Sequence, residues 1–541
     1  MSPPLRLAAL VDAGATPAWV SHALSVAVGI PGVHLAVVVT SSARAPTRPG
    51  RPPWAGRTCL AADRAWFRPS HPLHRPVPLD VGTGVPVVPW TSAAAFARLA
   101  DAHGVDVLID FTDGTASGEV LLPMGAWVPS HGGLTSEEAA LASALNGVLC
   151  VRSVLRRADD PSQVLVESVS RVDHVSLSRV LNHFYWKNVE LIGRGVRRLQ
   201  RERTAAPRTP SAARVAPLRA VEARDLAWRV PRHITRALRA RRTRRHHDSR
   251  WILLCGRREG HDIVDLKAMH PPRGHSWADP FVVADKGTRY VFFEDYRHDV
   301  ARGHIAVATI TQDGRLGPAR PALERPYHLS YPFVFQHEGA WYMLPETQAR
   351  RTVEVYRCDR LPDRWQFSHV LMDNVRAVDA TLLAHEGRWW LFANIAEFEG
   401  STTHDALFAF WADHPLSTNW RPHPANPVVA DVRRARPAGP FMRVGGRLLR
   451  PSQDCGVEYG RAVCLNEVVT LTTTDFEERP VGTYQATWDP QIVAMHTLSE
   501  HEGLVLLDGK LRTPRGRTAR RPSPATTCAL VRVDGPADRM P

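Results

Sequence analysis

The second half of the chain repeats one hairpin template four times. In the first three copies, eight residues separate an opening Asp279, Tyr331 or Asp379 from a glycine, and the fourth copy is one residue shorter. Each copy has two runs of β-branched and aromatic residues around an X-Gly pair, which is typical of a tight β-hairpin because glycine accepts the positive φ of the turn. The copies are WADPFVVADKGTRYVFFE (277–294), SYPFVFQHEGAWYMLPE (330–346), AVDATLLAHEGRWWLFAN (377–394) and AGPFMRVGGRLLRPSQD (438–454).

Folding each copy about its turn brings the first and last residues of the template together. Every hairpin therefore presents a pair of side chains at the same end, and the four ends should meet. The expected pairs are Asp279 with Glu294, Tyr331 with Glu346, Asp379 with Asn394, and Gly439 near Gln453.

The repeats predict a β-propeller. They follow one another at steps of 52, 48 and 60 residues, and each is followed by two further strand-like runs, so that one repeat supplies four strands. Such a unit cannot bury both of its own faces and has to stack on its neighbours. A weaker fifth copy occupies 495–510, and WILLCGR (251–257) is placed to close the ring with this last blade. We expect a five-bladed propeller over 251–515, followed by a tail at 516–541.

The first part of the chain has a different pattern. A chain of 541 residues is too long for one core. Apolar runs at 5–12, 34–41 and 106–111 suit buried parallel strands, and 17–29 and 93–104 suit helices between them. Residues 175–200 read as a long amphipathic helix. We expect a Rossmann-like α/β domain at 1–190.

An arginine-rich segment joins the two parts. Between Arg194 and Arg250 there are 18 Arg, no Lys and four acidic residues, so its net charge of +14 equals that of the whole chain. We interpret 191–250 as a linker with some helix at 233–246. Two interpretations stay open, a solvated linker or a patch that docks on anionic lipid at a membrane surface. No nucleic-acid partner is expected, because neither aromatic interleaving nor a recognition motif accompanies the arginines.

The composition of the chain indicates which cellular compartment and which cofactors to expect. No apolar run reaches membrane-spanning length, and the N-terminus lacks the features of a signal peptide. The seven Cys are scattered without a C-x-x-C pair, which suits reduced core residues. We therefore expect a cytoplasmic protein, peripheral at the membrane if the arginines dock on lipid. No cofactor is predicted, and no ligand spacing predicts a metal ion.

Four ordered motifs of the repeat region carry a family resemblance. WADPF, SYPFVF with WYMLPET, VDATL with WWLFAN, and RPSQDCGVEYGRAV together resemble bacterial proteins related to the N-terminal region of plant glucosamine inositolphosphorylceramide transferases. More distantly they resemble the five-bladed arabinanase, levansucrase and invertase glycosidases. That likeness implies an Asp opening blade 1 as base or nucleophile, an Asp opening blade 3 that tunes the acid, and a Glu from a later blade as the acid. Asp279 and Asp379 match the first two positions.

The N-terminal region resembles a formyltransferase domain. The likeness rests on DVLIDF (106–111) and on PMGAWVPSHGG (123–133). Formyltransferases carry an Asn-x-His pair after that strand, whereas here Trp127-Val128-Pro129-Ser130-His131 keeps only the His. The resemblance therefore implies a degenerate domain with a structural or substrate-gating role.

Making or breaking a glycosidic bond needs a carboxylate that activates a nucleophile and a group that handles the departing charge. We predict Asp279 as the base and Asp379 as its partner, with Glu294 and Glu346 as acid or sugar-hydroxyl ligands. Capping of strand ends is the alternative for the aspartates, and blade packing or structural hydrogen bonds are the alternatives for the Trp and His residues. The predicted substrate-binding residues are Trp277, His275, Tyr331, Asn394, Gln453, Asp454, Tyr459, Arg461 and His496.

Three functions follow from these residues. Blade 4 offers Gln453 and Asp454 where a glycosidase would supply its acid region, and a phosphate leaving group needs no strong acid. We therefore expect a glycosyltransferase that uses a nucleotide-sugar or lipid-phosphate sugar in glycolipid, polysaccharide or glycosylated-metabolite synthesis. A furanosidase-like glycoside hydrolase and a non-catalytic sugar-binding scaffold are the alternatives.

Overall fold

The computed structural model describes residues 3–14, 16–41, 54–79, 84–112, 114, 116–173, 175–202, 215–514 and 527–532. The chain divides into two compact units, residues 1–239 with 397–401 and residues 240–396 with 402–541, which are taken here one at a time. Parts of the predicted arginine-rich linker (203–214) and of the predicted tail (515–526 and 533–541) lie outside the described residues.

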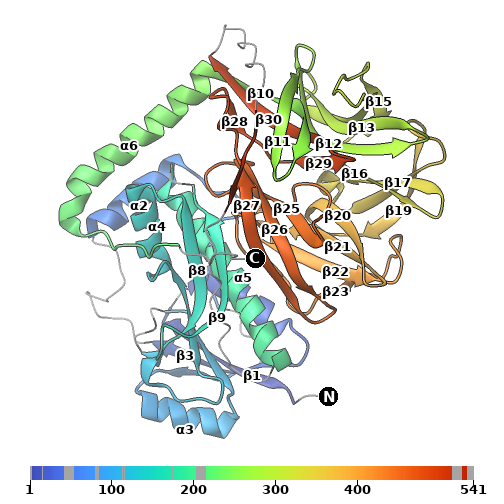
Figure 1. Cartoon of the computed structure of the whole chain (residues 1–541). Helices are drawn as coiled ribbons and strands as arrows, with labels where there is room; N and C mark the ends of the chain where they lie inside the picture. Colours follow the sequence, from blue (N-terminus) through green and yellow to red (C-terminus); the bar gives the residue numbers. More distant parts are fainter. Residues whose placement is uncertain are drawn as a thin grey trace, which may run out of the picture. The chain divides into compact units, whose positions relative to one another are not determined.

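The first unit contains a seven-stranded mixed sheet of order β5-β3-β1-β6-β7-β8-β9 (Figure 1). The strands from β5 to β7 are parallel, and β8 and β9 are antiparallel. This confirms the predicted α/β layering, because three of the expected strands are β1, β3 and β6. The strands of this unit are β1 (Leu5–Asp12), β2 (Thr16–Pro17), β3 (Val33–Ser41), β4 (Pro76–Val77), β5 (Val87–Pro89), β6 (Val107–Asp110), β7 (Ala126–His131), β8 (Cys150–Arg157) and β9 (Val164–Arg171).

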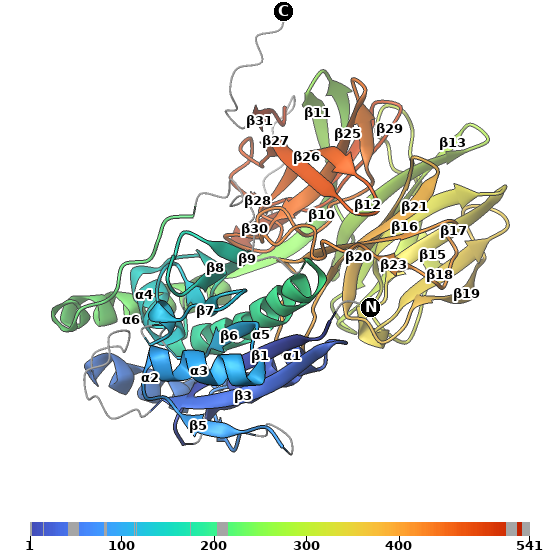
Figure 2. The same ribbon diagram turned by 90° about the horizontal axis from the view of Figure 1, so that it is seen from below.

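Helices cover both faces of this sheet. One core contains side chains of α1, α4 and α5, and a smaller core on the other face contains side chains of α3. Figure 2 shows α5 running beside α1. The helices are α1 (Ala18–Val28), α2 (Trp54–Trp66), α3 (Ala93–His103), α4 (Ser136–Asn146), α5 (Leu177–Glu202) and α6 (Ala223–His246).

The arginine-rich segment does not behave as one solvated linker. Its first residues belong to α5, where Arg194 and Arg198 are buried and paired with Glu190 and Glu202. Burial of a guanidinium requires such partners, and the amphipathic pattern of α5 supplies them one turn away. The predicted helix at 233–246 is the second half of α6.

The second unit is a five-bladed propeller, as predicted. Four sheets follow the repeats in order, and the fifth joins β10 to β30, so that the segment around 251–257 closes the ring as expected (Figure 1). The described part of the predicted tail includes β31, which pairs with β27 and extends blade 4. Blade 1 is β12 (His275–Asp285), β13 (Thr288–Arg297), β14 (Arg302–Thr309) and β15 (Arg320–Leu323); blade 2 is β16 (Ser330–His337), β17 (Ala340–Glu346), β18 (Val353–Cys358) and β19 (Trp365–Met372); blade 3 is β20 (Ala377–His385), β21 (Arg388–Ile395), β22 (Leu407–Ala412) and β23 (Arg421–Pro422); blade 4 is β24 (Met442–Val444), β25 (Arg447–Asp454), β26 (Ala462–Leu471), β27 (Phe476–Tyr484) and β31 (Leu530–Arg532); blade 5 is β10 (His247–Glu259), β11 (Asp262–Met269), β28 (Ile492–Ala494), β29 (Leu498–His501) and β30 (Leu504–Pro514).

The hydrophobic core lies between the blades. Each neighbouring pair shares a cluster of buried side chains, and the clusters continue around the ring to the contact of blade 5 with blade 1. The hairpin strands are therefore apolar on both faces, and polar side chains of the template are left for the strand ends.

The expected pairing within the hairpins is wrong by one residue at the inner end. Glu294 pairs with Ala278, Glu346 with Ser330, and Asn394 with Val378, because each inner strand carries an irregularity two residues long. In the fourth copy, the backbone N–H of Gln453 donates to the Arg436 carbonyl and its Nε2 donates to the Pro437 carbonyl, so Gln453 does not lie opposite Gly439.

All seven cysteines are free, and four of them are buried. Among the described helices, none combines the length and the apolar character that crossing a bilayer requires.

Candidate active site

Four equivalent residues at the inner ends of the blades have a left-handed backbone. The φ angles are 52° at Asp279, 44° at Tyr331, 54° at Asp379 and 123° at Gly439. A non-glycine residue in this region costs about 1–3 kcal/mol and persists only where its surroundings hold it. The register irregularities of the inner strands are the local cause, since the extra residue turns these side chains out of the strand pattern.

Asp279 is buried and bonded to three residues from two other blades, blade 2 and blade 5. Its Oδ2 accepts a hydrogen bond from the backbone N–H of Tyr331 at 3.1 Å, and its Oδ1 accepts one from the Thr497 hydroxyl at 2.7 Å. Its own N–H donates to Asp508 Oδ2 at 3.0 Å. Burial, opposed by His496 and reinforced by nearby carboxylates, raises the pKa of Asp279 to about 6.

Behind Asp279 lies an ion pair between His496 and Asp508. Nδ1 of His496 is 2.5 Å from Asp508 Oδ2, and the imidazole stacks on Trp251 with ring centroids 4.1 Å apart. Burial alone would lower the pKa of His496, but Asp508 and Asp279 outweigh it and the pKa is raised. Burial would raise the pKa of Asp508, yet His496 and several N–H donors hold it below its usual range.

Asp379 is held by an arginine and a glutamine from blade 4. Arg436 donates through Nε to Asp379 Oδ2 at 2.6 Å and through Nη2 to Oδ1 at 3.3 Å, and Gln453 Nε2 donates to Oδ2 at 3.0 Å. The same guanidinium lies 3.5 Å from Glu346 Oε2. Burial opposes the charge of Arg436, but Asp379, Tyr459 and Glu346 raise its pKa well above the ordinary value.

Two glutamates complete the cluster. Burial, followed by the charges of Asp279 and Glu346, raises the pKa of Glu294 well above its usual value. Burial and Asp379, opposed by Arg436, do the same for Glu346. The axis thus combines fixed carboxylates with carboxyl groups that favour the proton, which is the separation that acid–base chemistry requires.

Two tyrosines connect the blades around the cluster. The hydroxyl of Tyr331 lies 2.8 Å from Thr381 Oγ1 and accepts a hydrogen bond from the Gly439 N–H at 2.9 Å. The ring of Tyr459 lies under the Arg436 guanidinium, 4.9 Å from ring centroid to Cζ, and contacts His496 edge-on at 5.1 Å. Both hydroxyls have raised pKa values because they are buried.

The structure does not bring every predicted residue to this cluster. Within the described residues, Asn394 Nδ2 donates to the Thr403 carbonyl, Asp454 lies 3.3 Å from Arg461, and no contact joins these three to the axial carboxylates. His275 and Trp277 line a separate cavity on blade 1. Alternation explains Asp454, the strand neighbour of Gln453. His275 and Trp277 belong to the regular part of β12, before the irregularity that turns Asp279 to the axis.

Three members of the cluster were not predicted from the sequence. Asp508 follows from the fifth hairpin, because folding it about Glu502-Gly503 places Asp508 beside Thr497. Arg436 lies in a proline-containing connection without strand pattern, and Trp251 belongs to the closing strand, so neither has a local signal.

Asp279, His496 and Asp508 are the residues of the axis that could hold a metal ion, since one ligand atom from each lies within 4.8 Å of the others. Hydrogen bonds fix the two carboxylates, from Thr497 and the Tyr331 N–H at Asp279 and from the backbone N–H groups of His496 and Thr497 at Asp508.

Residues 268–493 match the family described as glucosamine inositolphosphorylceramide transferase 1, N-terminal. A rice (Oryza sativa subsp. japonica) glucosamine inositolphosphorylceramide transferase 1 is 35% identical over 211 residues, which cover 38% of this chain and 28% of that protein. The protein of the same name from Arabidopsis thaliana is 32% identical over 204 residues, covering 37% and 26%. The chain thus spans little more than a quarter of the length of these relatives.

Solved structures that resemble the chain include two glycosidases. The catalytic domain of the Coprinopsis cinerea GH62 α-L-arabinofuranosidase is 13% identical, with 52% of this chain and 96% of that one covered and a TM-score of 0.36. A family 117 glycoside hydrolase from the marine bacterium Zobellia galactanivorans is 12% identical, with 49% and 90% covered and a TM-score of 0.31. At such TM-scores these likenesses carry no argument, and the five-bladed description rests on the sheets themselves.

Proposed function

We propose that the propeller carries the active site of a carbohydrate-active enzyme, a glycosyltransferase acting in glycolipid, polysaccharide or glycosylated-metabolite synthesis. The observation that supports this most is the group of carboxylates that blades 1, 2 and 3 bring to the axis, where Arg436 pairs with Asp379 and Glu346 and where the pKa values of Asp279, Glu294 and Glu346 are raised. The family that matches residues 268–493 and the plant relatives carry the name glucosamine inositolphosphorylceramide transferase 1, which agrees with transfer rather than hydrolysis.

Asp279 acts as the base in this proposal. With a pKa of about 6 it is mostly ionised at neutral pH, and Thr497 and the Tyr331 N–H fix its oxygens. It takes the proton of an acceptor hydroxyl while that oxygen bonds to the anomeric carbon of the donor sugar. The bond from the anomeric carbon to the phosphate oxygen breaks, the electron pair leaves with the phosphate, and Asp279 releases the proton to solvent.

Asp379 and the two glutamates handle charge and orientation. Arg436 and Gln453 hold Asp379, so that its negative charge can stabilise the positive charge that develops on the sugar ring. Glu294 and Glu346, which favour the protonated form, donate hydrogen bonds to sugar hydroxyls.

Glycoside hydrolysis is the second candidate, and the same glutamates favour it. A carboxyl group kept protonated beside an ionised carboxylate is what protonates a leaving alcohol in a glycosidase. In that reaction water replaces the acceptor, and Glu294 or Glu346 gives its proton to the glycosidic oxygen.

Acceptor dependence separates the two reactions. The full chain is incubated with nucleotide sugars or polyprenyl-phosphate sugars, with and without a mixture of lipid and sugar acceptors, and with aryl arabinofuranosides. Transfer predicts donor consumption only when an acceptor is present. Release of free sugar from the arabinofuranoside in water alone would assign hydrolysis, and binding without turnover of either substrate would leave the sugar-binding scaffold.

Helix α6 is the proposed contact with anionic lipid. Trp228, Ile234 and Leu238 are exposed on a helix rich in arginine, and the guanidinium groups of Arg229 and Arg232 lie over the Trp228 ring. Apolar side chains among basic ones are typical of helices that lie on membranes. In a flotation assay, phosphatidylserine vesicles should carry the wild-type protein to the top of the gradient. They should not carry Leu238→Ser, and phosphatidylcholine vesicles should not carry the wild-type protein. Equal recovery in all three cases would mean that this segment is a solvated linker.

The first unit has a structural role in this proposal, as a degenerate formyltransferase-like domain of a cytoplasmic protein. His131 is buried between Ser153, 2.7 Å away, and Asn188, 2.9 Å away. Burial lowers its pKa to about 3, so the imidazole is neutral. His131→Asn should lower thermal stability and leave sugar turnover intact, and loss of turnover in a folded variant would contradict this.

A further inference from the structure

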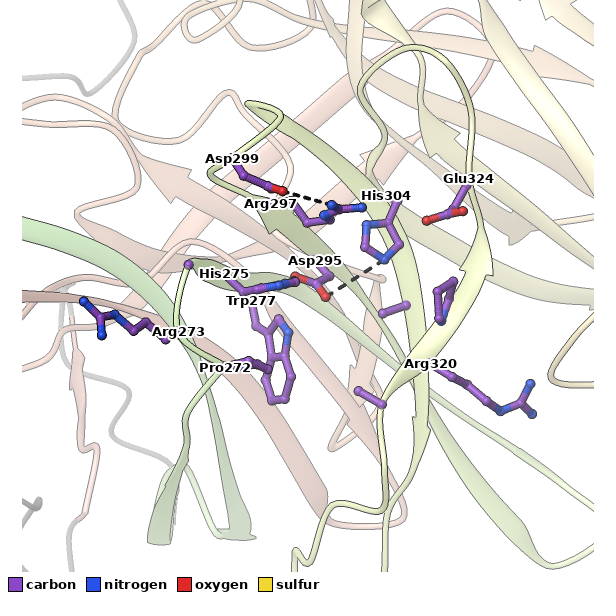
Figure 3. A pocket seen from close by; sticks show the side chains of 14 residues that line it. Pro272, Arg273, His275, Trp277, Asp295, Arg297, Asp299, His304, Arg320 and Glu324 are labelled. Atoms are coloured by element: carbon purple, nitrogen blue, oxygen red, sulfur yellow. Dashed lines mark hydrogen bonds and ion pairs between the residues drawn. The ribbon is translucent and has the colours of Figure 1, made fainter.

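A cavity of about 580 Å³ lies on blade 1, lined by residues of β12 to β15 and of the preceding loop (Figure 3). This volume is in the usual range for small-molecule sites. None of the four predicted catalytic carboxylates lines it. The cavity is therefore a second candidate site within the propeller, separate from the axis.

An aspartate and two histidines form the polar centre of this cavity. Asp295 is buried, and its Oδ1 lies 2.7 Å from His275 Nδ1. The imidazole N–H donates there, which leaves Nε2 of His275 as an acceptor. His304 Nε2 lies 3.9 Å from Asp295 Oδ2, too far for a direct hydrogen bond, so a ligand hydroxyl fits between them (Figure 3).

Trp277 forms an apolar wall beside this centre. Its side chain is 8% exposed and its indole nitrogen has no hydrogen-bond partner among the described residues. Figure 3 shows the ring below Asp295. Because the indole nitrogen has almost no accessible surface, a ligand in the cavity meets the carbon atoms of the ring rather than its N–H.

The charges that line the cavity are balanced. Arg273, Arg297 and Arg320 face three acidic residues, and Arg297 is already paired with Asp299 at 3.0 Å. Arg320 is paired with Asp363 at 3.0 Å. Two of the three guanidinium groups are therefore already neutralised by carboxylates, which favours a ligand without charge over a phosphate or carboxylate.

We propose that the blade 1 cavity binds a neutral saccharide unit. Vicinal hydroxyls donate to Asp295 and to His275 Nε2, His304 bonds a hydroxyl that bridges to Asp295, and the face of the sugar packs on Trp277. Aromatic walls with carboxylate and imidazole partners suit such a ligand, because a sugar offers both C–H faces and many hydroxyl donors. The site holds glycan that the axis does not contact.

Fluorine NMR of the full chain labelled with 5-fluorotryptophan tests this proposal. The Trp277 resonance is the one missing from Trp277→Phe. D-Glucose, D-mannose, N-acetyl-D-glucosamine and L-arabinose are titrated one at a time, with D-glucose 6-phosphate as the charged comparison. At least one neutral sugar should shift the Trp277 resonance, and Asp295→Asn should weaken that binding at least about tenfold, because a hydrogen bond to a charged group is lost.

Matched variants keep the result interpretable. Trp389→Phe, which changes a tryptophan on blade 3, should leave the binding constant unchanged, as should Asp279→Asn at the axis, so that failure of the proposed activity and failure of this site are distinguishable. His275→Gln should weaken binding if Asp295→Asn alters the fold. No response to any neutral sugar, a response to glucose 6-phosphate alone, or equal binding by the folded Asp295 and His275 variants would overturn the proposal.

Discussion

Replacing Arg436 by methionine removes the only cation that bonds Asp379 in the described structure. The guanidinium is 7% exposed and donates twice to Asp379, at 2.6 and 3.3 Å, with Glu346 3.5 Å away. Breaking a buried ion pair by removing one partner costs about 3–5 kcal/mol, since the remaining charge stays uncompensated. We expect Arg436→Met to lose this much folding free energy.

A double-mutant cycle isolates the pair. Asp379→Asn removes the charge that Arg436 compensates, so Arg436→Met combined with Asp379→Asn should cost less than the two single changes together, by about 2 kcal/mol. Urea unfolding followed by circular dichroism at neutral pH measures each variant. Arg357→Met, whose partner Asp359 is 75% exposed, is the matched control and should cost less than about 1 kcal/mol. If Arg436→Met costs no more than the control, and the cycle shows no coupling, the electrostatic account of the axis is wrong.

Three further predictions concern the same region. Tyr331→Phe leaves the buried Gly439 N–H without an acceptor and should lower the free energy of unfolding, measured in urea, by about 1–3 kcal/mol. A change within experimental error would contradict a stabilising hydrogen bond between blades 2 and 4. Gly439→Ala places a Cβ 1.9 Å from the Leu498 carbonyl oxygen and should abolish soluble expression, whereas Gly445→Ala, at φ 56° in open space, should stay soluble; equal behaviour would refute the packing argument. Turnover should be present above pH 6 and fall below it as Asp279, with a pKa of about 6, takes a proton; a rate that stays level down to pH 5 would exclude Asp279 as the base.

The propeller could be predicted because its signal is repeated. Hairpin turns, strand periodicity and equal spacing point to the same fold at several places, and agreement among local signals is what specifies a structure. The left-handed residues at the axis were not predicted, although Pro280 and Pro332 directly follow Asp279 and Tyr331 and a proline inside a strand is typical of a bulge. Asp379 is followed by Ala380, so the third copy carries no such mark. The pairing rule therefore failed at the one position where the side chains matter most.

Contacts between segments far apart in the chain also could not be predicted from the sequence. Arg436 approaches Asp379 from another blade, 57 residues along the chain, and nothing in the sequence around either residue marks that contact. Asp508 was not predicted, although folding the fifth hairpin copy about its turn would have placed it beside Thr497. His275 and Trp277 were assigned to the axis because they lie close to Asp279 in the sequence, yet only Asp279 stands at the irregularity of β12, and the other two line the blade 1 cavity.

Turnover by two aspartate variants of one blade tests the central claim most directly. Asp279→Asn changes the proposed base at the axis, and Asp313→Asn changes a surface partner of Arg315 on the same blade, outside the blade 1 cavity. With a donor and acceptor pair that the wild-type chain converts, the account predicts loss of at least about a hundredfold in rate for Asp279→Asn, the size of a general-base contribution, and a wild-type rate for Asp313→Asn. Equal rates for both folded variants would contradict an active site at the propeller axis.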